Sequence, residues 1–487
     1  MLFNSFTYLV FLPIVVLLYW VLPEKFRRTL LLVASYIFYM NWMPAYGLLI
    51  LALTLVNYAI GIAIDKHREK GKAYLTAGLI FNLSCLCFFK YANFLVDSVV
   101  QSVNWVTHST GAQAAVLQSP ALKIILPLGI SFFTFEFIHY ITDIYRGDKP
   151  VKNIRDFALF AAFFPSQIAG PIKRFQDFMG QLDEKIVFKF RNFYDGLFLI
   201  FQGLFKKIVL GDNLGAVVNA GFSHIDKLGM LDAWIAVAGF TFQIFFDFAG
   251  YTDIGRGSAL LFGYKVPENF NLPFLAANLT EFWRRWHMSL STWLRDYLFI
   301  PLGGSRGGAW KVRRNVLITM VLGGLWHGAA WHYVIWGAFH GMGLVLSKEW
   351  HDLVSKVPLL AKLRPHPLWH CAGIVLTIFF LFQAGILFRA DGIPQALAIA
   401  QKMYIAAPSR IVVDSFLSSC LPLALTLYWS FLLTKAFFEK STNKYATSIL
   451  HWWLNSAPAQ TVAYMSMAMI ILGFAPMQVA PFIYFQF

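Results

Sequence analysis

The stretch from Asn315 to Ser347 reads NVLITMVLGGLWHGAAWHYVIWGAFHGMGLVLS and contains no residue with a formal charge. It is longer than the ~20 residues with which an α-helix crosses the hydrocarbon core of a membrane. Other apolar stretches cover residues 5–22, 42–64, 74–89, 230–246, 370–387 and 421–437. This pattern predicts an all-α, polytopic integral membrane protein with about ten to twelve transmembrane or re-entrant helices.

The composition and the placement of charge favour the same class. Hydrophobic residues make up 58% of the 487 residues and charged residues only 13%, which excludes a soluble globular protein. Short loops between apolar stretches, such as 25–28 and 66–72, carry much of the net charge of +15. The positive-inside bias places these loops in the cytoplasm. A nucleic-acid-binding protein would gather its charge in polar domains, so we expect membrane lipid and no nucleic acid among the partners.

The chain shows no linker rich in Gly, Pro or Ser and no internal repeat. We therefore expect residues 1–487 to form a single membrane-embedded domain. Four cysteines, Cys85, Cys87, Cys371 and Cys420, lie in apolar surroundings without the spacing of a metal site. We expect them to pack in the core, and we expect no bound metal.

His327 is the strongest candidate for chemistry, because ionisable side chains inside membrane stretches are usually functional. Gly324 and Gly328 flank it and leave the backbone open to a bulky ligand or to another helix. The alternative is an imidazole that only bonds a neighbouring helix. On one continuous helix His332 and His340 would each lie about 140° from His327, so we expect structural roles for them. No His-x-x-x-His pair suggests a metal site here.

A second region, residues 266–314, is both aromatic and basic. The pattern predicts a helix capped by Thr280. One stripe of it carries Trp283, Trp286, His287, Leu290, Leu294 and Tyr297, while Arg284, Arg285, Arg295 and Asp296 lie off the stripe. His287 is therefore expected to point into protein.

Two further helices carry polar stripes. One stripe consists of Glu136, His139, Tyr140 and Asp143. The other consists of Gln243, Asp247 and Tyr251, with Asp253 close by. Such stripes either hydrogen-bond neighbouring helices or line a substrate path, and both interpretations stay open.

Acyl transfer to a hydroxyl needs a general base, a positioned thioester and a polar group for the developing oxyanion. A buried histidine meets the first need. No Gly-x-Ser-x-Gly elbow supports a serine acyl-enzyme, so we favour direct attack of the acceptor hydroxyl on the thioester.

Several motifs, taken together and in order, resemble those of the membrane-bound O-acyltransferases, in particular the bacterial branch of the alginate O-acetylation membrane subunit. They are PLGISFFTF (127–135), DIYR (143–146), FP (164–165), AGPI (169–172), FDFAGYTD (246–253), FWRRWH (282–287), LRDYL (294–298), PLGG (301–304), LWHG (325–328) and PFIYFQF (481–487). The sequence differs from the usual pattern at His332, Glu136 and His139, which points to a different acceptor or partner.

The resemblance implies a ring of helices around a central tunnel in the bacterial cytoplasmic (inner) membrane. It implies that His327 and His287 are catalytic. Residues expected to support the site or line the tunnel are Trp326, Arg295, Asp296, Gln243, Asp247, Tyr251 and Asp253. The implied donor is acetyl-CoA or an acyl-carrier thioester from the cytoplasm, with no bound cofactor. The implied acceptor is an exported polysaccharide, reached directly or through an extracytoplasmic SGNH-type partner protein.

Alternative functions remain open. The nearest is D-alanyl transfer to teichoic acid from a carrier-protein thioester, with the same two histidines. A transporter or flippase would also use polar stripes, but it would be expected to show repeat symmetry. A di-iron oxygenase would need clustered histidines, and the 12 histidines of this chain are scattered.

Overall fold

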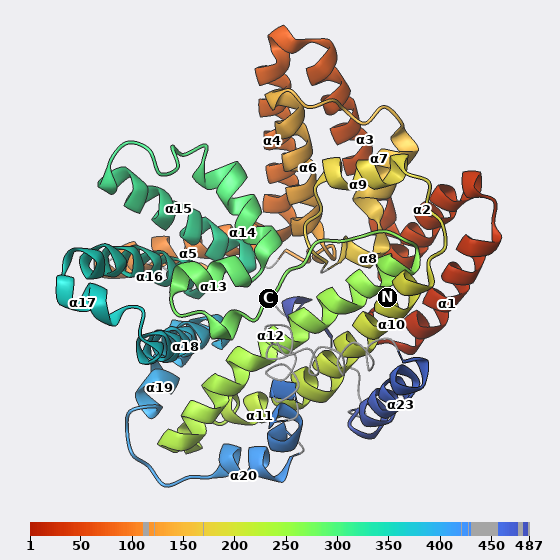
Figure 1. The fold of residues 1–487 in the computed structure, drawn as a ribbon. Helices are drawn as coiled ribbons and strands as arrows, with labels where there is room; N and C mark the ends of the chain where they lie inside the picture. Colours follow the sequence, from red (N-terminus) through yellow and green to blue (C-terminus); the bar gives the residue numbers. More distant parts are fainter. Residues whose placement is uncertain are drawn as a thin grey trace.

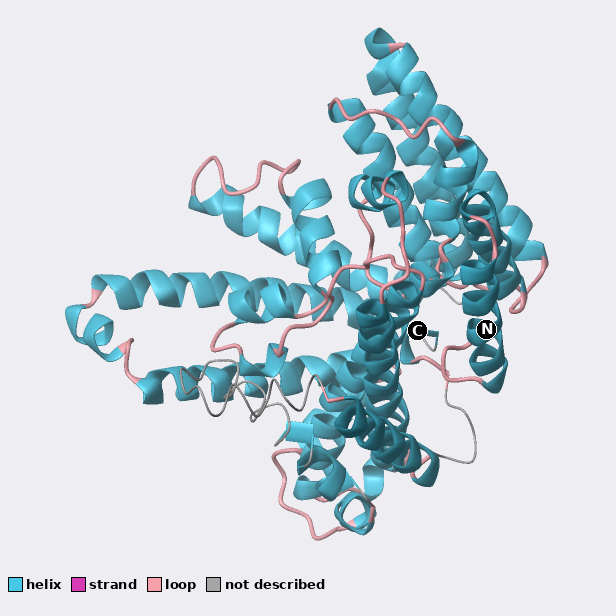
Figure 2. Ribbon diagram, turned by 45° about the vertical axis from the view of Figure 1, so that its right-hand side comes forward, coloured by secondary structure: helices cyan, strands magenta, loops and turns pink. Residues whose placement is uncertain are grey.

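The computed structural model describes residues 1–110, 116–120, 122–168, 170–419, 421–426, 428–429, 456–475 and 481–485. Every regular element within these ranges is a helix, as Figure 2 shows. The predicted all-α class is thereby confirmed. Cys420, Ala169 and most of the predicted span 421–437 lie outside the described residues.

The elements that place the site are α1 (Phe6–Val21), α2 (Glu24–Met40), α3 (Ala45–Lys66), α4 (Gly71–Leu86), η2 (Cys87–Tyr91), α5 (Ala92–Ser109), α6 (Ile130–Arg146), α9 (Phe175–Asp183), α10 (Phe190–Leu204), η3 (Phe205–Asp212), α11 (Asn213–Phe222), α12 (Met230–Leu261), α13 (Leu279–Arg285), α14 (Met288–Leu294), η6 (Arg295–Phe299), α15 (Ala309–His327), α16 (Trp331–Lys356), α18 (Pro367–Arg389) and η7 (Ile483–Phe485). The remaining described helices are α7 (Ile154–Ala162), α8 (Phe164–Gln167), α17 (Pro358–Leu363), α19 (Ile393–Lys402), α20 (Ile411–Ser418) and α23 (Ala457–Gly473), with short 3₁₀ turns at Arg68–Lys70, Ile225–Lys227 and Pro273–Leu275.

The long helix α12 crosses the middle of the molecule (Figure 1). Glycines bring α10 close to it: a Cβ added at Gly203 would lie 2.6 Å from the Gly250 carbonyl oxygen, and one at Gly257 would lie 2.4 Å from that of Gly196. Both helices place their glycines seven residues apart, which keeps them on one face. Close backbone packing through small residues is typical of membrane helices.

Helices α3, α4 and α6 form a second group, which stands together at the top of Figure 1. Asn57 and Asn82 join α3 to α4 by two buried amide hydrogen bonds of 3.0 and 2.7 Å. The ring of Tyr140, on α6, fills the space beside Gly61. A third group, α15, α16 and α18, lies on the left of Figure 1, where α18 packs on α12.

Four described helices or helical stretches are long and apolar enough to cross a membrane: Ala45–Lys66, Arg68–Ser109, Met230–Leu261 and Pro367–Arg389. Shorter apolar helices, such as α1, accompany them. On α1 the side chains of Phe6, Leu17 and Val21 are 79%, 65% and 73% exposed, as expected for residues that face lipid. The predicted polytopic membrane class is confirmed, whereas the number of ten to twelve crossings stays a prediction.

Candidate active site

His327 is the last residue of α15, and its side chain is buried. The helix ends inside the protein, so its last carbonyl groups need donors from elsewhere. The Tyr91 hydroxyl donates to the Leu325 carbonyl at 2.8 Å, and the Lys90 ammonium donates to the carbonyls of Trp326 and His327, the latter at 3.1 Å. A cation at a helix C-terminus is also favoured by the helix dipole. Sequence reasoning missed Lys90; its charge beside an apolar stretch was the available signal.

The glycines beside His327 serve contacts between helices. A Cβ at Gly324 would lie 2.3 Å from the Tyr333 carbonyl oxygen, and one at Gly328 would lie 2.0 Å from the Tyr333 ring. On α16, a Cβ at Gly337 would lie 2.3 Å from the Met320 carbonyl oxygen. Of the two uses predicted for these glycines, the structure supports the approach of another helix.

The chain does not continue as one helix through this region, because residues 328–330 separate α15 from α16. The assumption of one continuous helix, on which His340 was placed about 140° from His327, is therefore wrong, whereas the structural roles expected for His332 and His340 stay predictions. His327 and His340 line the same cavity, and each contacts the Trp336 ring, at 5.0 and 4.4 Å between ring centroids. His332 lies at the start of α16 and lines neither of the two cavities described below.

Two cavities meet at His327. The narrow cavity lies among α12, α13, α16 and α18 and is lined by Trp283, Trp286, Trp336, His340 and Phe388. The wide cavity is lined by Trp42, Lys90, Ile125, Phe132, Trp326 and Phe482. The volume of the narrow cavity is about 50 Å³ and that of the wide cavity about 240 Å³. His327 and Tyr484 line both cavities.

Within the described residues, the His327 Nδ1 atom is buried and has no hydrogen-bond partner. The ring is held by aromatic contacts, with centroids 4.8 Å from Trp326, 5.0 Å from Phe388 and 5.6 Å from Tyr484. Buried polar atoms are normally paired. The imidazole is therefore held in place by packing while its Nδ1 atom stays available to a ligand.

His287 is fully buried, as predicted, but not on a continuous helix. It separates α13 from α14 and has a left-handed backbone with φ of 43°. Such a conformation costs of order 1–3 kcal/mol for a residue other than glycine. Helix α13 begins at Leu279 with Asn278 as its cap, so the prediction of a cap at Thr280 is wrong. The break arises because tertiary contacts replace helical hydrogen bonds: the amide of Met288 donates to the Asn269 carbonyl at 2.9 Å.

The His287 ring lies close to the His327 region. Its centroid is 6.0 Å from that of Trp326 and 4.7 Å from that of Phe248. Neither ring nitrogen has a hydrogen-bond partner among the described residues. His287 lines neither cavity, so the structure brings both histidines into contact with the Trp326 ring but not into one pocket.

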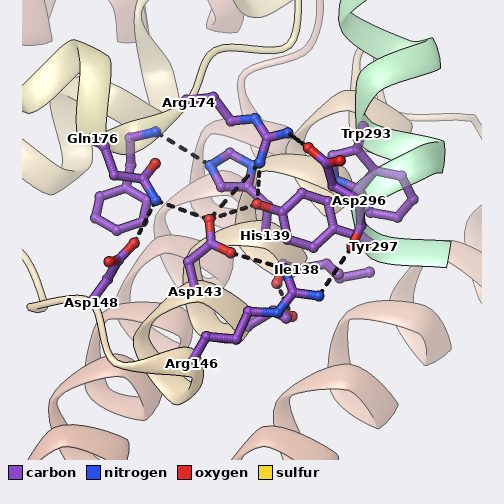
Figure 3. Close-up of polar contacts among 12 residues, drawn as sticks. Ile138, His139, Asp143, Arg146, Asp148, Arg174, Gln176, Trp293, Asp296 and Tyr297 are labelled. Carbon is purple, nitrogen blue, oxygen red and sulfur yellow. Dashed lines mark hydrogen bonds and ion pairs between the residues drawn. The ribbon is translucent and has the colours of Figure 1, made fainter. Parts of the chain in front are cut away.

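Asp296 lies in a separate polar network, which Figure 3 shows around Asp143, and Arg295 donates a hydrogen bond to Asp296 at 2.7 Å. The Asp143 carboxylate accepts hydrogen bonds from Tyr297 at 2.6 Å and from Gln176 at 2.9 Å. Arg174 forms an ion pair with Asp296 at 2.6 Å.

Partial burial acts to raise the pKa of Asp296, but hydrogen bonds from Arg295 and Arg174 outweigh it and hold that pKa below its usual value. This network joins α6, α9 and η6, and none of its charged residues lines either cavity.

The polar stripe of α12 also faces protein and neither cavity. Asp253 forms an ion pair with Lys206 at 2.5 Å, and Asp247 forms one with Lys207 at 2.5 Å. The Tyr251 hydroxyl contacts Asn4. Gln243 lies against α11, where its amide nitrogen would be 2.8 Å from a Cβ at Gly215. Of the predicted supporting residues, Trp326 alone lines a cavity.

No group of three or more His, Cys, Asp or Glu side chains that could hold a metal ion occurs in the described part of the chain. The cysteines Cys87 and Cys371 are exposed and free, and Cys85 is half-buried. The prediction that the cysteines pack in the core is therefore wrong for Cys87 and Cys371, whose apolar surroundings lie at the outside of a membrane protein.

Known proteins match the chain over most of its length. Residues 151–388 match the model of the membrane-bound O-acyltransferase family. Probable alginate O-acetylase AlgI of Pseudomonas aeruginosa is 42% identical over 83% of this chain and 74% of its own. Peptidoglycan O-acetyltransferase of Helicobacter pylori is 34% identical over 83% of this chain and 80% of its own. Teichoic acid D-alanyltransferase of Streptococcus thermophilus is 32% identical over 49% of this chain and 62% of its own.

The family predicted from the motifs is confirmed by these matches. Identities of 42% and 34%, over 74% and 80% of these two relatives, do not arise from shared hydrophobicity alone. The chain belongs to the membrane-bound O-acyltransferase family and is a membrane-embedded acyltransferase.

Proposed function

We propose that this protein transfers an acetyl group from a cytoplasmic thioester to an exported polysaccharide, with His327 as the general base. The observation that carries the proposal is the place of His327, which lines both cavities. The names of the relatives favour a polysaccharide acceptor, since one is a probable alginate O-acetylase and another a peptidoglycan O-acetyltransferase.

The charge distribution favours opposite openings for the two cavities. Helix α2 begins beside Lys25, and α3 ends at Lys66, both in the basic loops assigned to the cytoplasm. Trp42 lies between these helices and therefore near the outer face, and it lines the wide cavity. The narrow cavity reaches along α16 to His340, toward the end of α16 where Arg313 pairs with Glu349 at 2.9 Å. We assign the acceptor to the wide cavity and the thioester to the narrow one.

In this mechanism an acceptor hydroxyl in the wide cavity gives its proton to His327 as its oxygen attacks the thioester carbonyl carbon. The tetrahedral intermediate collapses, the carbon–sulfur bond breaks, and the thiol leaves with the proton. In a buried site a nearby positive charge stabilises the developing oxyanion more strongly than it would in water. Lys90, which lines the wide cavity, can supply such a charge. His287 supports the site across the Trp326 ring.

The remaining assignments follow from the same proposal. The donor is acetyl-CoA or an acylated carrier protein, and the location is the bacterial inner membrane. An extracytoplasmic SGNH-type partner completes delivery to the polymer. D-alanyl transfer to teichoic acid is the second candidate, favoured by the match to the Streptococcus thermophilus enzyme but over a smaller part of the chain. A transporter or flippase has no support from the family match.

The test is release of free thiol from acetyl-CoA by the purified protein, with a soluble oligosaccharide acceptor and the partner protein. His327→Ala is expected to abolish release. His332→Ala is the matched control, because His332 is also buried, at the start of α16, but lines neither cavity, and it is expected to retain release. Full activity in His327→Ala would refute the base assignment.

A further inference from the structure

The segment 481–485 borders both cavities, and its residues Phe482 and Ile483 are buried. Tyr484 lines both of them, and Phe482 lines the wide one. The Phe482 ring packs on Tyr251 at 4.5 Å between centroids, and the Tyr484 ring packs on Phe248 at 5.0 Å. Both partners belong to α12, so this segment is packed on α12 where it borders the two cavities beside His327.

A buried ionic trio holds this segment. Lys207, on η3, lies between Asp212 at 2.6 Å and Asp247 at 2.5 Å. The other oxygen of Asp247 accepts the backbone N–H of Ile483 at 2.6 Å, and Lys207 contacts the Pro481 carbonyl at 3.4 Å. The three charged side chains are between 1% and 5% exposed.

Such a trio is not an efficient source of stability, because well-packed apolar side chains of similar volume often stabilise a protein as much or more. What apolar side chains cannot do is hold the backbone of a passing segment. Asp247 can stay ionised as an acceptor for Ile483 only if a cation compensates its charge in the interior. Lys207 supplies that cation and also bonds the segment itself.

We infer that Lys207 is a positioning residue that acts through Asp247. Together they hold segment 481–485 as a partition between the wide cavity and the narrow cavity. The partition keeps water in the wide cavity away from the thioester in the narrow one, so that thiol release stays coupled to acyl transfer. This inference rests on the proposed function.

We expect the thioester to be hydrolysed when segment 481–485 no longer separates the cavities. With a loosened partition, a water oxygen adds to the acyl carbon, the carbon–sulfur bond breaks, and the products are free acetate and the thiol. Each such event releases one thiol without acetylating an acceptor. The ratio of thiol released to acetyl transferred therefore reports the state of the partition.

The adjacent residue provides a matched control. Lys206 is also a buried lysine of η3 and also pairs with an aspartate of α12, Asp253, at 2.5 Å. It forms no hydrogen bond to segment 481–485 in the part of the chain that the structure describes. Lys206→Met thus removes an equivalent ion pair and leaves the partition in place.

The experiment uses the full-length protein in lipid nanodiscs with its partner, radiolabelled acetyl-CoA and an oligosaccharide acceptor, and measures thiol, free acetate and acetylated acceptor. Lys207→Met is expected to raise the ratio of thiol to transferred acetyl several-fold. Lys206→Met is expected to keep the wild-type ratio of one. Equal ratios in both variants, with activity falling in parallel, would show that Lys207 is only structural and would overturn the inference.

Phe482→Ala gives an independent measurement if Lys207→Met does not fold, because it opens the partition and leaves the ionic trio intact. It is expected to raise the same ratio, and an unchanged ratio in a folded Phe482→Ala protein also overturns the inference. The experiment distinguishes failure of the proposed function from failure of the partition inference. A wild type that releases no thiol refutes the proposed function, whereas a coupled wild type with coupled variants refutes the partition alone.

Discussion

Lys90 forms hydrogen bonds to the end of helix α15, whose last residue is His327. Its ammonium group donates to the carbonyls of Trp326 and His327, and it lies 5.8 Å from the centre of the Trp326 ring. Within the described residues it has no carboxylate partner. The charge of Lys90 is therefore stabilised by the end of α15, and the orientation of His327 depends in turn on Lys90.

Replacing Lys90 by methionine removes both hydrogen bonds of the ammonium group and its charge, while keeping much of the side-chain volume. Hydrogen bonds that involve a charged group contribute about 1.5–3 kcal/mol each, so we expect a lower melting temperature and a large loss of thiol release. Lys90→Arg keeps the charge and the donors and is expected to keep most activity. Thiol release by Lys90→Met at the rate of the wild type would contradict the role assigned to this lysine.

At the scale of elements, the packing of α10 on α12 depends on glycines. Their backbones approach so closely that a single added methyl group meets carbonyl oxygen. The aspartates that hold η3 and segment 481–485 lie on the same helix, α12. A shift of α10 would therefore displace the groups that border the active site.

Gly257→Ala is expected to destabilise the protein by about 1–3 kcal/mol, the usual effect of overpacking, because the new Cβ would lie 2.4 Å from the Gly196 carbonyl oxygen. Gly180→Ala on α9 is the control, since a Cβ there meets nothing within 4 Å. Alanine in an open helical position gains about 0.5–1 kcal/mol over glycine. Melting temperatures in detergent should fall for the first variant and stay level or rise for the second. The reverse order would contradict this account of the interface.

At the scale of the whole molecule, the two cavities that His327 borders are lined by residues from helices that are distant in sequence, among them α6, α12, α16 and α18. Exposed apolar side chains on the outer helices face lipid, and charged networks such as that of Asp143 lie between helices. The assignment of the two cavities to donor and acceptor depends on which face of this molecule is cytoplasmic.

The orientation can be tested by cysteine labelling in intact cells, in a variant in which the native cysteines are replaced by serine. Trp42→Cys is expected to react with a membrane-impermeant maleimide added outside, because Trp42 is 51% exposed between α2 and α3. Lys70→Cys lies in a basic loop and is expected to react only after the membrane is permeabilised. The opposite pattern would exchange the assignments of the two cavities.

Much of the fold and part of the site follow from the sequence alone. Membrane insertion depends on the length and apolarity of each stretch, which are local properties, so the all-α membrane class could be predicted without contacts. The uncharged setting of His327 and the ordered motifs pointed to the family in the same way. The buried position of His287 was also predicted correctly, because the aromatic stripe around it survives on two short helices.

Tertiary structure alone decided how these parts meet. The breaks at His287 and after His327 depend on contacts with residues distant in sequence, such as Asn269 and Lys90, and helical periodicity cannot anticipate them. Those breaks brought His340 into the cavity of His327 and kept Arg295 and Asp296 out of it. Local composition determined which segments enter the membrane, whereas long-range hydrogen bonds and glycine contacts determined where each helix ends, and therefore which side chains share the active site.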